Sequence, residues 1–377
     1  MEIISFVIIL VFILSIQKYI FLKFSLQDLE YSCRFSVTEA NEGDEILLIE
    51  TLSNNKLLPL PWLKVEIFTS KWLSFAETNS VVAQDTRFVT SGFFLWGFQK
   101  TTRSWKVKCL KRGHYIIDSV SFVSGDIFGA STSVSIKINE SLSVYPRTLD
   151  LQNIFTSRHH LTGDNLVRKW IIDDPFLISG IREYCPGDSI NRIHWKVSSK
   201  LGSIYVKKNE YTSKQDVIII LNIQSTDFDY NEVLYKERVE HGISLAATFL
   251  WNSYGSGLAV RFITNGMVKG IKDRYIITDS DSKKEHFIKI YDLLSRLELE
   301  ASVYFEELLK EITHIADNSD VLIITSYLSE DIIKIVKYLC FNDNSVKILA
   351  TSEKMGCFRI PEDMQLYFYL GDEKINE

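Results

Sequence analysis

An uncharged apolar run opens the chain and constrains its fold more than any other feature. Residues 3–16 carry no charge, and after a Gln-Lys interruption the apolar run continues to residue 22. About 20 such residues span a bilayer as a helix, and Lys18 can extend its charged end to the interface. The run therefore predicts an uncleaved transmembrane anchor over residues 1–24. A signal peptide is the alternative, opposed by Glu2 where a basic segment is expected and by the lack of an A-x-A-like cleavage site.

The charges around this run predict its orientation. Lys18 and Lys23 lie at its carboxyl end, whereas Glu2 is the charge that precedes it. Basic flanks stay on the cytoplasmic side of a membrane. We therefore expect a single-pass protein of the cell membrane with its soluble domains in the cytoplasm. The five cysteines form no C-x-x-C pair, a pattern typical of a reducing compartment.

Composition excludes some classes of protein. The chain has 377 residues, 46% of them hydrophobic and 24% charged, which allows two or three folded units. The formal net charge of -6 argues against a general nucleic-acid binder. No G-x-G-x-x-G or G-x-x-x-x-G-K-[ST] phosphate motif occurs. We expect no nucleic-acid partner and no nucleotide cofactor.

The predicted secondary structure of the residues after the apolar run changes near the middle of the chain. Residues 25–147 contain short β-branched and aromatic runs separated by turn signals, which predicts an antiparallel β-sandwich-like domain. Residues 148–214 form a connector. Residues 215–377 alternate strands and helices, which predicts a doubly wound parallel sheet. The predicted strands here are 216–223, 257–264, 321–325, 346–351 and 364–370, and the predicted helices are 231–254, 284–298, 302–316 and 329–341. The overall expectation is an α+β multidomain chain.

The connector ends in an unusual mixed run, residues 180–196. Pro186, Gly187 and Asp188 form a turn signal, and Arg182 could pair with Asp188 across that turn. The candidate binding or interdomain residues are Arg182, Tyr184, Pro186, Gly187, Asp188, Arg192, His194, Trp195 and Lys196. Three interpretations remain open: a latch between domains, a binding surface, and a catalytic centre. In the third, Asp188 and His194 act as an acid–base pair with Arg182 nearby, in a hydrolase or transferase.

This run resembles the signature of a bacterial family known as domain of unknown function 58. The resemblance rests on Arg-Glu-Tyr-x-Pro-Gly-Asp at 182–188 and Arg-x-His-Trp-Lys at 192–196, and weaker matches lie in the β part. It implies that the carboxyl-terminal part is a von Willebrand factor A-like domain. It also implies a membrane-anchored protein whose partners include a MoxR-type AAA+ ATPase or a transglutaminase-like membrane protein, acting in envelope assembly or stress tolerance.

Domains of the von Willebrand factor A type can bind a divalent cation through D-x-S-x-S after the first strand. The matching positions here are Asn222, Gln224 and Thr226, so the leading aspartate is an amide. Thr325-Ser326-Tyr327 follows another strand, where a metal-binding relative has an acid. Hard cations prefer charged oxygen ligands, so we expect this motif to be degenerate, with no metal and no other cofactor. The function expected from the sequence is a non-enzymatic, membrane-tethered scaffold that binds a protein partner and, through its anchor, membrane lipid.

Overall fold

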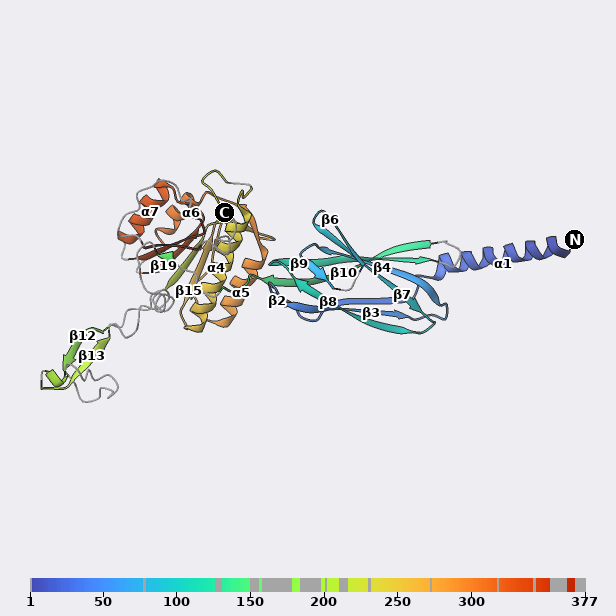
Figure 1. The fold of residues 1–377 in the computed structure, drawn as a ribbon, viewed down its shortest axis with the longest axis horizontal. Coiled ribbons are helices and arrows are strands. Elements are labelled where there is room, and N and C mark those ends of the chain that lie inside the picture. The colour runs from blue at the N-terminus through green and yellow to red at the C-terminus, as the bar shows by residue number, and fades with distance from the viewer. Residues whose placement is uncertain are drawn as a thin grey trace. The chain divides into compact units, whose positions relative to one another are not determined.

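The structure is a computed structural model in which two compact units divide the chain, Met1–Arg147 and Thr148–Glu377 (Figure 1). It describes residues 2–76, 79–125, 131–149, 156–157, 178–183, 198–200, 202–209, 216–229, 232–271, 273–316, 319–341, 344–352 and 365–369. Each unit is considered by itself.

Helix α1 spans Glu2–Phe24 and contains the apolar run. It is the one helix in the described ranges that is long and apolar enough to cross a bilayer. Its apolar side chains are mostly exposed along residues 3–20, an arrangement compatible with lipid surroundings. The sequence prediction of a membrane-compatible helix is therefore confirmed, and its orientation stays a prediction.

The rest of the first unit, which we call the β module, contains two sheets. The first has the order β1-β3-β8-β5, and the second has the order β2-β10-β9-β4-β7-β6. The strands are β1 (Leu29–Phe35), β2 (Glu39–Asn41), β3 (Glu45–Asn54), β4 (Leu60–Ser70), β5 (Leu73–Phe75), β6 (Asn79–Ala83), β7 (Thr86–Leu95), β8 (Lys100–Cys109), β9 (Gly113–Gly125) and β10 (Ser131–Tyr145).

Both sheets contribute to one hydrophobic core. Buried and more exposed residues alternate along β3 and β4, so each strand turns one face inward. Leu48 and Leu52 from the first sheet share this core with Val65 and others from the second. The predicted antiparallel sandwich is confirmed in part: the other strand pairs of the two sheets are antiparallel, but β2 pairs with β10 in parallel. A three-residue strand such as β2 carries too little periodicity to be predicted.

The second unit is built on a mixed sheet with the order β11-β21-β20-β19-β14-β15-β17. The strands of the unit are β11 (Thr156–Ser157), β12 (Ile178–Glu183), β13 (Tyr205–Asn209), β14 (Val217–Leu221), β15 (Val260–Thr264), β16 (Gly266–Val268), β17 (Ile276–Ile277), β18 (Leu297–Ala301), β19 (Asp320–Thr325), β20 (Ser345–Ala350) and β21 (Gln365–Phe368). The helices are α4 (Lys236–Gly255), α5 (Lys284–Arg296), α6 (Phe305–Ile312) and α7 (Glu330–Phe341). Strands β15, β14, β19, β20 and β21 run parallel.

Helices pack on this sheet because its central strands are apolar on both faces. All five residues of β14 are buried, the pattern of a strand covered on both sides. Gly242 of α4 lies against Leu221 and Ile324, where an added Cβ would make ordinary contact. Helices α6 and α7 share a core with Ile218 and Ile220, which alternate with Leu221 along β14. The mixed α/β architecture expected from the sequence is present.

Three predicted helices differ from the structure. The helix predicted over 231–254 begins at Lys236 and ends at Gly255. The helix predicted over 284–298 ends at Arg296, and Leu297–Ala301 forms strand β18 beside β16. Leu-Glu-Leu-Glu-Ala alternates apolar and acidic residues, a period of two that favours a strand. The helix predicted over 302–316 is shorter, because α6 begins at Phe305 and ends at Ile312.

Candidate functional site

The candidate site lies where the order of the parallel sheet reverses. From β14 the chain passes through α4 to β15 on one side, while β19 lies on the other side of β14. The carboxyl ends of β14 and β19 therefore flank a topological switch point, the usual ligand position in open α/β sheets. The degenerate motif at Asn222, Gln224 and Thr226 directly follows β14, and Thr325 ends β19.

Asn222 is buried, with 2% of its surface exposed, and both its side-chain oxygen and its side-chain nitrogen form hydrogen bonds. Its Oδ1 accepts hydrogen bonds from the Gln224 backbone N–H (2.9 Å) and from Asn265 Nδ2 (3.2 Å). Its Nδ2 donates to Thr325 Oγ1 over 3.0 Å. An aspartate at this position would keep the acceptor but lose the N–H that donates to Thr325, whose own hydroxyl proton is donated to the Tyr327 carbonyl. The amide therefore joins three neighbouring strand ends.

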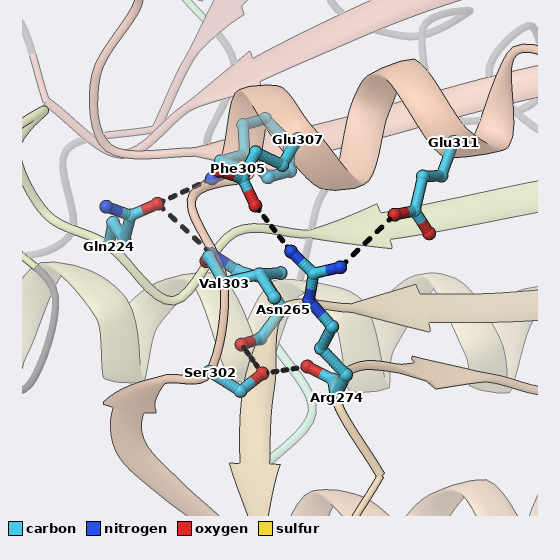
Figure 2. A network of polar contacts seen from close by, with 8 residues as sticks. All are labelled: Gln224, Asn265, Arg274, Ser302, Val303, Phe305, Glu307 and Glu311. Atoms are coloured by element: carbon cyan, nitrogen blue, oxygen red, sulfur yellow. Dashed lines mark hydrogen bonds and ion pairs between the residues drawn. The ribbon is translucent and has the colours of Figure 1, made fainter.

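Gln224 connects the same network to helix α6. Its Oε1 accepts from the Phe305 backbone N–H (2.7 Å) and from Asn265 Nδ2 (3.3 Å) (Figure 2). Its Nε2 donates to the Asp229 carbonyl. Tyr304, at the N-cap of α6, makes no side-chain capping bond. Gln224 thus satisfies one of the N–H groups that a helix leaves free at its first turn.

Asn265 and its neighbours extend the network away from the switch point. Asn265 Nδ2 also donates to the Val303 carbonyl, and the Ser302 hydroxyl lies within hydrogen-bonding distance of the carbonyl oxygens of Asn265 and Arg274, to either of which it can donate. The Arg274 guanidinium then lies 2.8 Å from Glu307 and 3.7 Å from Glu311 (Figure 2). This outer pair is solvent-exposed and contributes little stability, so the buried amides are the part that holds the strand ends together.

Asp229 is the buried acid of the β14–α4 loop. It accepts hydrogen bonds from the Ser225 N–H (3.0 Å), the Ser225 hydroxyl, the Thr226 hydroxyl (2.6 Å) and the Leu234 N–H (3.2 Å). Burial raises the pKa of Asp229, but the hydrogen bonds from Ser225, Thr226 and Leu234 together lower the pKa by more than burial raises it. The pKa of this carboxyl therefore lies below its ordinary value. The carboxylate is held charged by the loop that surrounds it.

These residues do not fit a divalent cation. A cation needs free oxygen lone pairs, preferably on carboxylates. Here Asn265 directs N–H groups at the oxygens of both Asn222 and Gln224, and the Thr226 hydroxyl is bonded to Asp229. In the described ranges, no group of three His, Cys, Asp or Glu residues gathers in a metal-binding arrangement. Internal hydrogen bonds therefore occupy the oxygen atoms that a cation would need.

Tyr327 adds one unsatisfied polar group beside this network. The residue is 7% exposed, and its hydroxyl has no hydrogen-bond partner among the residues that the structure describes. Burial, followed by the charge of Glu306, raises the pKa of this phenol. The phenol therefore stays protonated and keeps a hydrogen bond to donate.

The rim of the site is apolar. Phe228 and Leu234, on the loop that carries Asp229, are 86% and 68% exposed. Tyr235 follows, with the Arg238 guanidinium 4.1 Å from its ring centroid. Large exposed apolar side chains gathered on one loop are typical of an interaction surface.

The signature residues are mostly outside the described residues: this applies to Tyr184, Pro186, Gly187, Asp188, Arg192, His194, Trp195 and Lys196. Arg182 lies on β12 and pairs through its backbone with Val206 of β13. Sequence reasoning missed the roles of Asn265, Thr325 and Asp229. An amide or hydroxyl residue at the carboxyl end of each of three apolar strands was the available signal.

The fold and the site together define a mixed α/β protein with a membrane-compatible amino-terminal helix. Residues 180–278 match the family model described as "Protein of unknown function DUF58". The chain is 22% identical over 267 residues to the uncharacterized protein YeaD of Bacillus subtilis (strain 168). This alignment covers 71% of the present chain and 62% of the Bacillus protein.

Solved structures match smaller parts. A non-cellulosomal cohesin from Archaeoglobus fulgidus is 15% identical with a TM-score of 0.22, covering 30% of this chain and 91% of the cohesin. Spo0M, a sporulation control protein from Bacillus subtilis, is 11% identical with a TM-score of 0.20, covering 30% of this chain and 50% of Spo0M. With scores this low, neither structure informs the function.

Proposed function

We propose that this protein is a membrane-tethered, cytoplasm-facing interaction protein whose second unit is a von Willebrand factor A-like domain that binds a protein partner without a divalent cation. The supporting observation is the combination found on the β14–α4 loop. Its polar residues are bonded internally to Asp229, while its apolar residues Phe228 and Leu234 are exposed.

This combination favours a docking surface. Preorganised loops lose little conformational freedom on binding, which leaves more of the contact energy available as affinity. An exposed aromatic side chain on such a loop is the type of residue that dominates protein interfaces. Phe228 therefore provides the central contact in this proposal, and Tyr235 with Arg238 extends it.

The identity of the partner is proposed from the family resemblance, as a MoxR-type AAA+ ATPase or a transglutaminase-like membrane protein. The test places a photo-crosslinking amino acid at position 228 of the full-length protein in membranes. The expected result is an adduct with the partner, together with direct binding of the purified ATPase that Phe228→Asp abolishes.

A matched control is available on α7. Phe341 is 85% exposed, almost the same as Phe228, and ends that helix. Phe341→Asp is expected to leave binding intact, because it adds the same charge elsewhere. Equal loss of binding in both variants, or no adduct at position 228, contradicts the proposed surface.

A further inference from the structure

We propose that the end of the β module next to α1 is a lipid-contacting surface, in which Leu57, Trp96 and Phe98 enter the interfacial layer of the membrane that α1 spans. This inference rests on the proposed membrane tether and goes beyond it, because it assigns a second, separate membrane contact to the folded β module.

Two loops form this surface, residues 55–59 between β3 and β4 and residues 96–99 between β7 and β8. Asn54, which is fully buried, joins them: its Nδ2 donates to the Leu58 carbonyl (2.9 Å) and to the Trp96 carbonyl (3.0 Å). The Phe98 N–H also donates to the Lys56 carbonyl over 3.1 Å. The two loops therefore behave as one rigid tip.

The tip is bonded to the residues that follow α1. The Asn55 N–H donates to the Asp28 carbonyl (3.0 Å), and Lys56 Nζ donates to the Gln27 carbonyl (2.6 Å). Phe21, in the last turns of α1, is part of the core of the β module. The end of the spanning helix and the tip are thus fixed to each other within the first unit.

Chain length places the tip in the interface. The apolar run ends at residue 22 and α1 at Phe24. One helical turn rises about 5.4 Å. The headgroup layer is about 5–8 Å thick on each side, the difference between a core of about 30 Å and a bilayer of about 40–45 Å. If α1 spans the bilayer, residues bonded to Gln27 and Asp28 lie within that layer or at its edge.

The side chains at the tip suit this position. Leu57, Trp96 and Phe98 are 79%, 63% and 71% exposed, although a folded domain usually leaves few large apolar groups together on its surface. The Phe94 and Trp96 rings are in edge-to-face contact, with their centroids 5.1 Å apart. Aromatic residues are enriched at membrane interfaces, and the nearby cations Lys56 and Lys100 complement anionic headgroups.

Backbone strain supports the same assignment. Phe98 has a φ of 56°, in the left-handed region where a bulky residue is rare. Gly97 precedes it with the Leu57 carbonyl so close that a Cβ would overlap it, at 2.5 Å. A strained residue persists where the surroundings or a function require it, and here the strain keeps an aromatic ring on the outer face of the tip.

The test uses the full-length protein in vesicles of phosphatidylethanolamine and phosphatidylglycerol. Cys185, Cys340 and Cys357 are replaced by serine, while the buried Cys33 and Cys109 remain. An environment-sensitive fluorophore is then attached to Leu57→Cys or Phe98→Cys. Nitroxide-labelled phospholipid is expected to quench both probes, and both emissions shift to the blue relative to the protein in detergent.

Two further probes make the result decisive. Leu110→Cys labels an exposed leucine after β8, at the other end of the β module, and is expected to remain unquenched. Ile9→Cys labels α1 and reports whether the tether itself is inserted. Quenching at position 9 without quenching at positions 57 and 98 overturns the lipid contact of the tip but leaves the membrane tether intact. A partner protein that covers the tip would give this result. No quenching at position 9 overturns both the tether and the lipid contact.

Discussion

The Asn222 side chain donates a hydrogen bond to the Thr325 hydroxyl over 3.0 Å, joining the carboxyl ends of β14 and β19. Thr325 Oγ1 in turn donates to the Tyr327 carbonyl (2.8 Å), which fixes the chain as it leaves β19. The position where open α/β sheets bind ligands is thus held by side chains of the protein itself.

Asn222→Asp tests this arrangement. The change removes the bond to Thr325 and places a charge in a buried site, so we expect the free energy of unfolding to fall by about 1–3 kcal/mol. Because Gln224 and Thr226 are already engaged, added Mg²⁺ is not expected to restore the loss. Thermal unfolding with and without Mg²⁺ measures both effects, and recovery of the Tm by the cation would contradict a metal-independent site.

Asp229→Asn is expected to destabilise the protein in a pH-dependent way. The folded-state pKa of Asp229 lies below its unfolded value of about 3.9. Its stabilising contribution is therefore fully present above pH 4 and is lost as the pH falls through the folded-state pKa. The difference in unfolding free energy between wild type and variant should be largest near pH 7 and shrink in acid.

A suitable control for Asp229 is Asp273→Asn, at an exposed position of the same unit. Surface substitutions away from special features usually change stability within about 0.5 kcal/mol, so this variant should follow wild type at each pH. A wild-type–D229N difference that is independent of pH would show that the charge of Asp229 does not contribute.

Glu50→Ala is expected to weaken the β module strongly. Glu50 is fully buried and accepts hydrogen bonds from the Tyr31 hydroxyl (2.7 Å), the Ser91 hydroxyl (3.4 Å) and the Trp105 indole. Removing the acceptor leaves these donors without a partner, which costs about 1–3 kcal/mol for each buried group left unpaired. Denaturant unfolding measures the change. Glu45→Ala, an exposed position on the same strand, is the control and should be nearly neutral.

Asn54→Ala should loosen both loops of the tip together. The variant loses the two bonds to Leu58 and Trp96, and we expect about 1–3 kcal/mol of destabilisation. Hydrogen exchange should accelerate at residues 55–59 and 96–99 and remain unchanged in the turn that contains Trp72, which lies at the other end of β4. Faster exchange in one loop alone would show that Asn54 does not couple them.

Phe98→Gly separates backbone strain from membrane contact. Glycine relieves a positive φ that costs an ordinary residue about 1–2 kcal/mol, and it adds about 0.5–1 kcal/mol of unfolded-state entropy. The free energy of unfolding should therefore be unchanged or slightly higher. In the vesicle experiment, the probe at position 57 should be quenched less in this variant, because the aromatic contact is lost. A clear loss of stability would place Phe98 among the structural residues.

The sequence indicated the elements whose residues repeat at a regular period. The β-branched and aromatic runs expected within residues 25–147 include β3 and β4, and the strand predicted over 216–223 is the buried strand β14. It did not indicate the pair formed by β16 and β18. In β18 the apolar residues alternate with a period of two directly after the helical pattern of α5. Whether these residues extend the helix or form a strand depends on the presence of the partner strand β16.

The sequence by itself determined that the chain begins with a membrane-compatible helix, continues with β structure and then alternates strands and helices, because local periodicity and hydropathy are properties of consecutive residues. Only the tertiary structure decided what Asn222, Asn265 and Thr325 do, because hydrogen bonds across 42 and 103 residues depend on which strands become neighbours. The same is true of Asn54, whose two carbonyl partners lie 4 and 42 residues away and are brought together by the pairing of β strands.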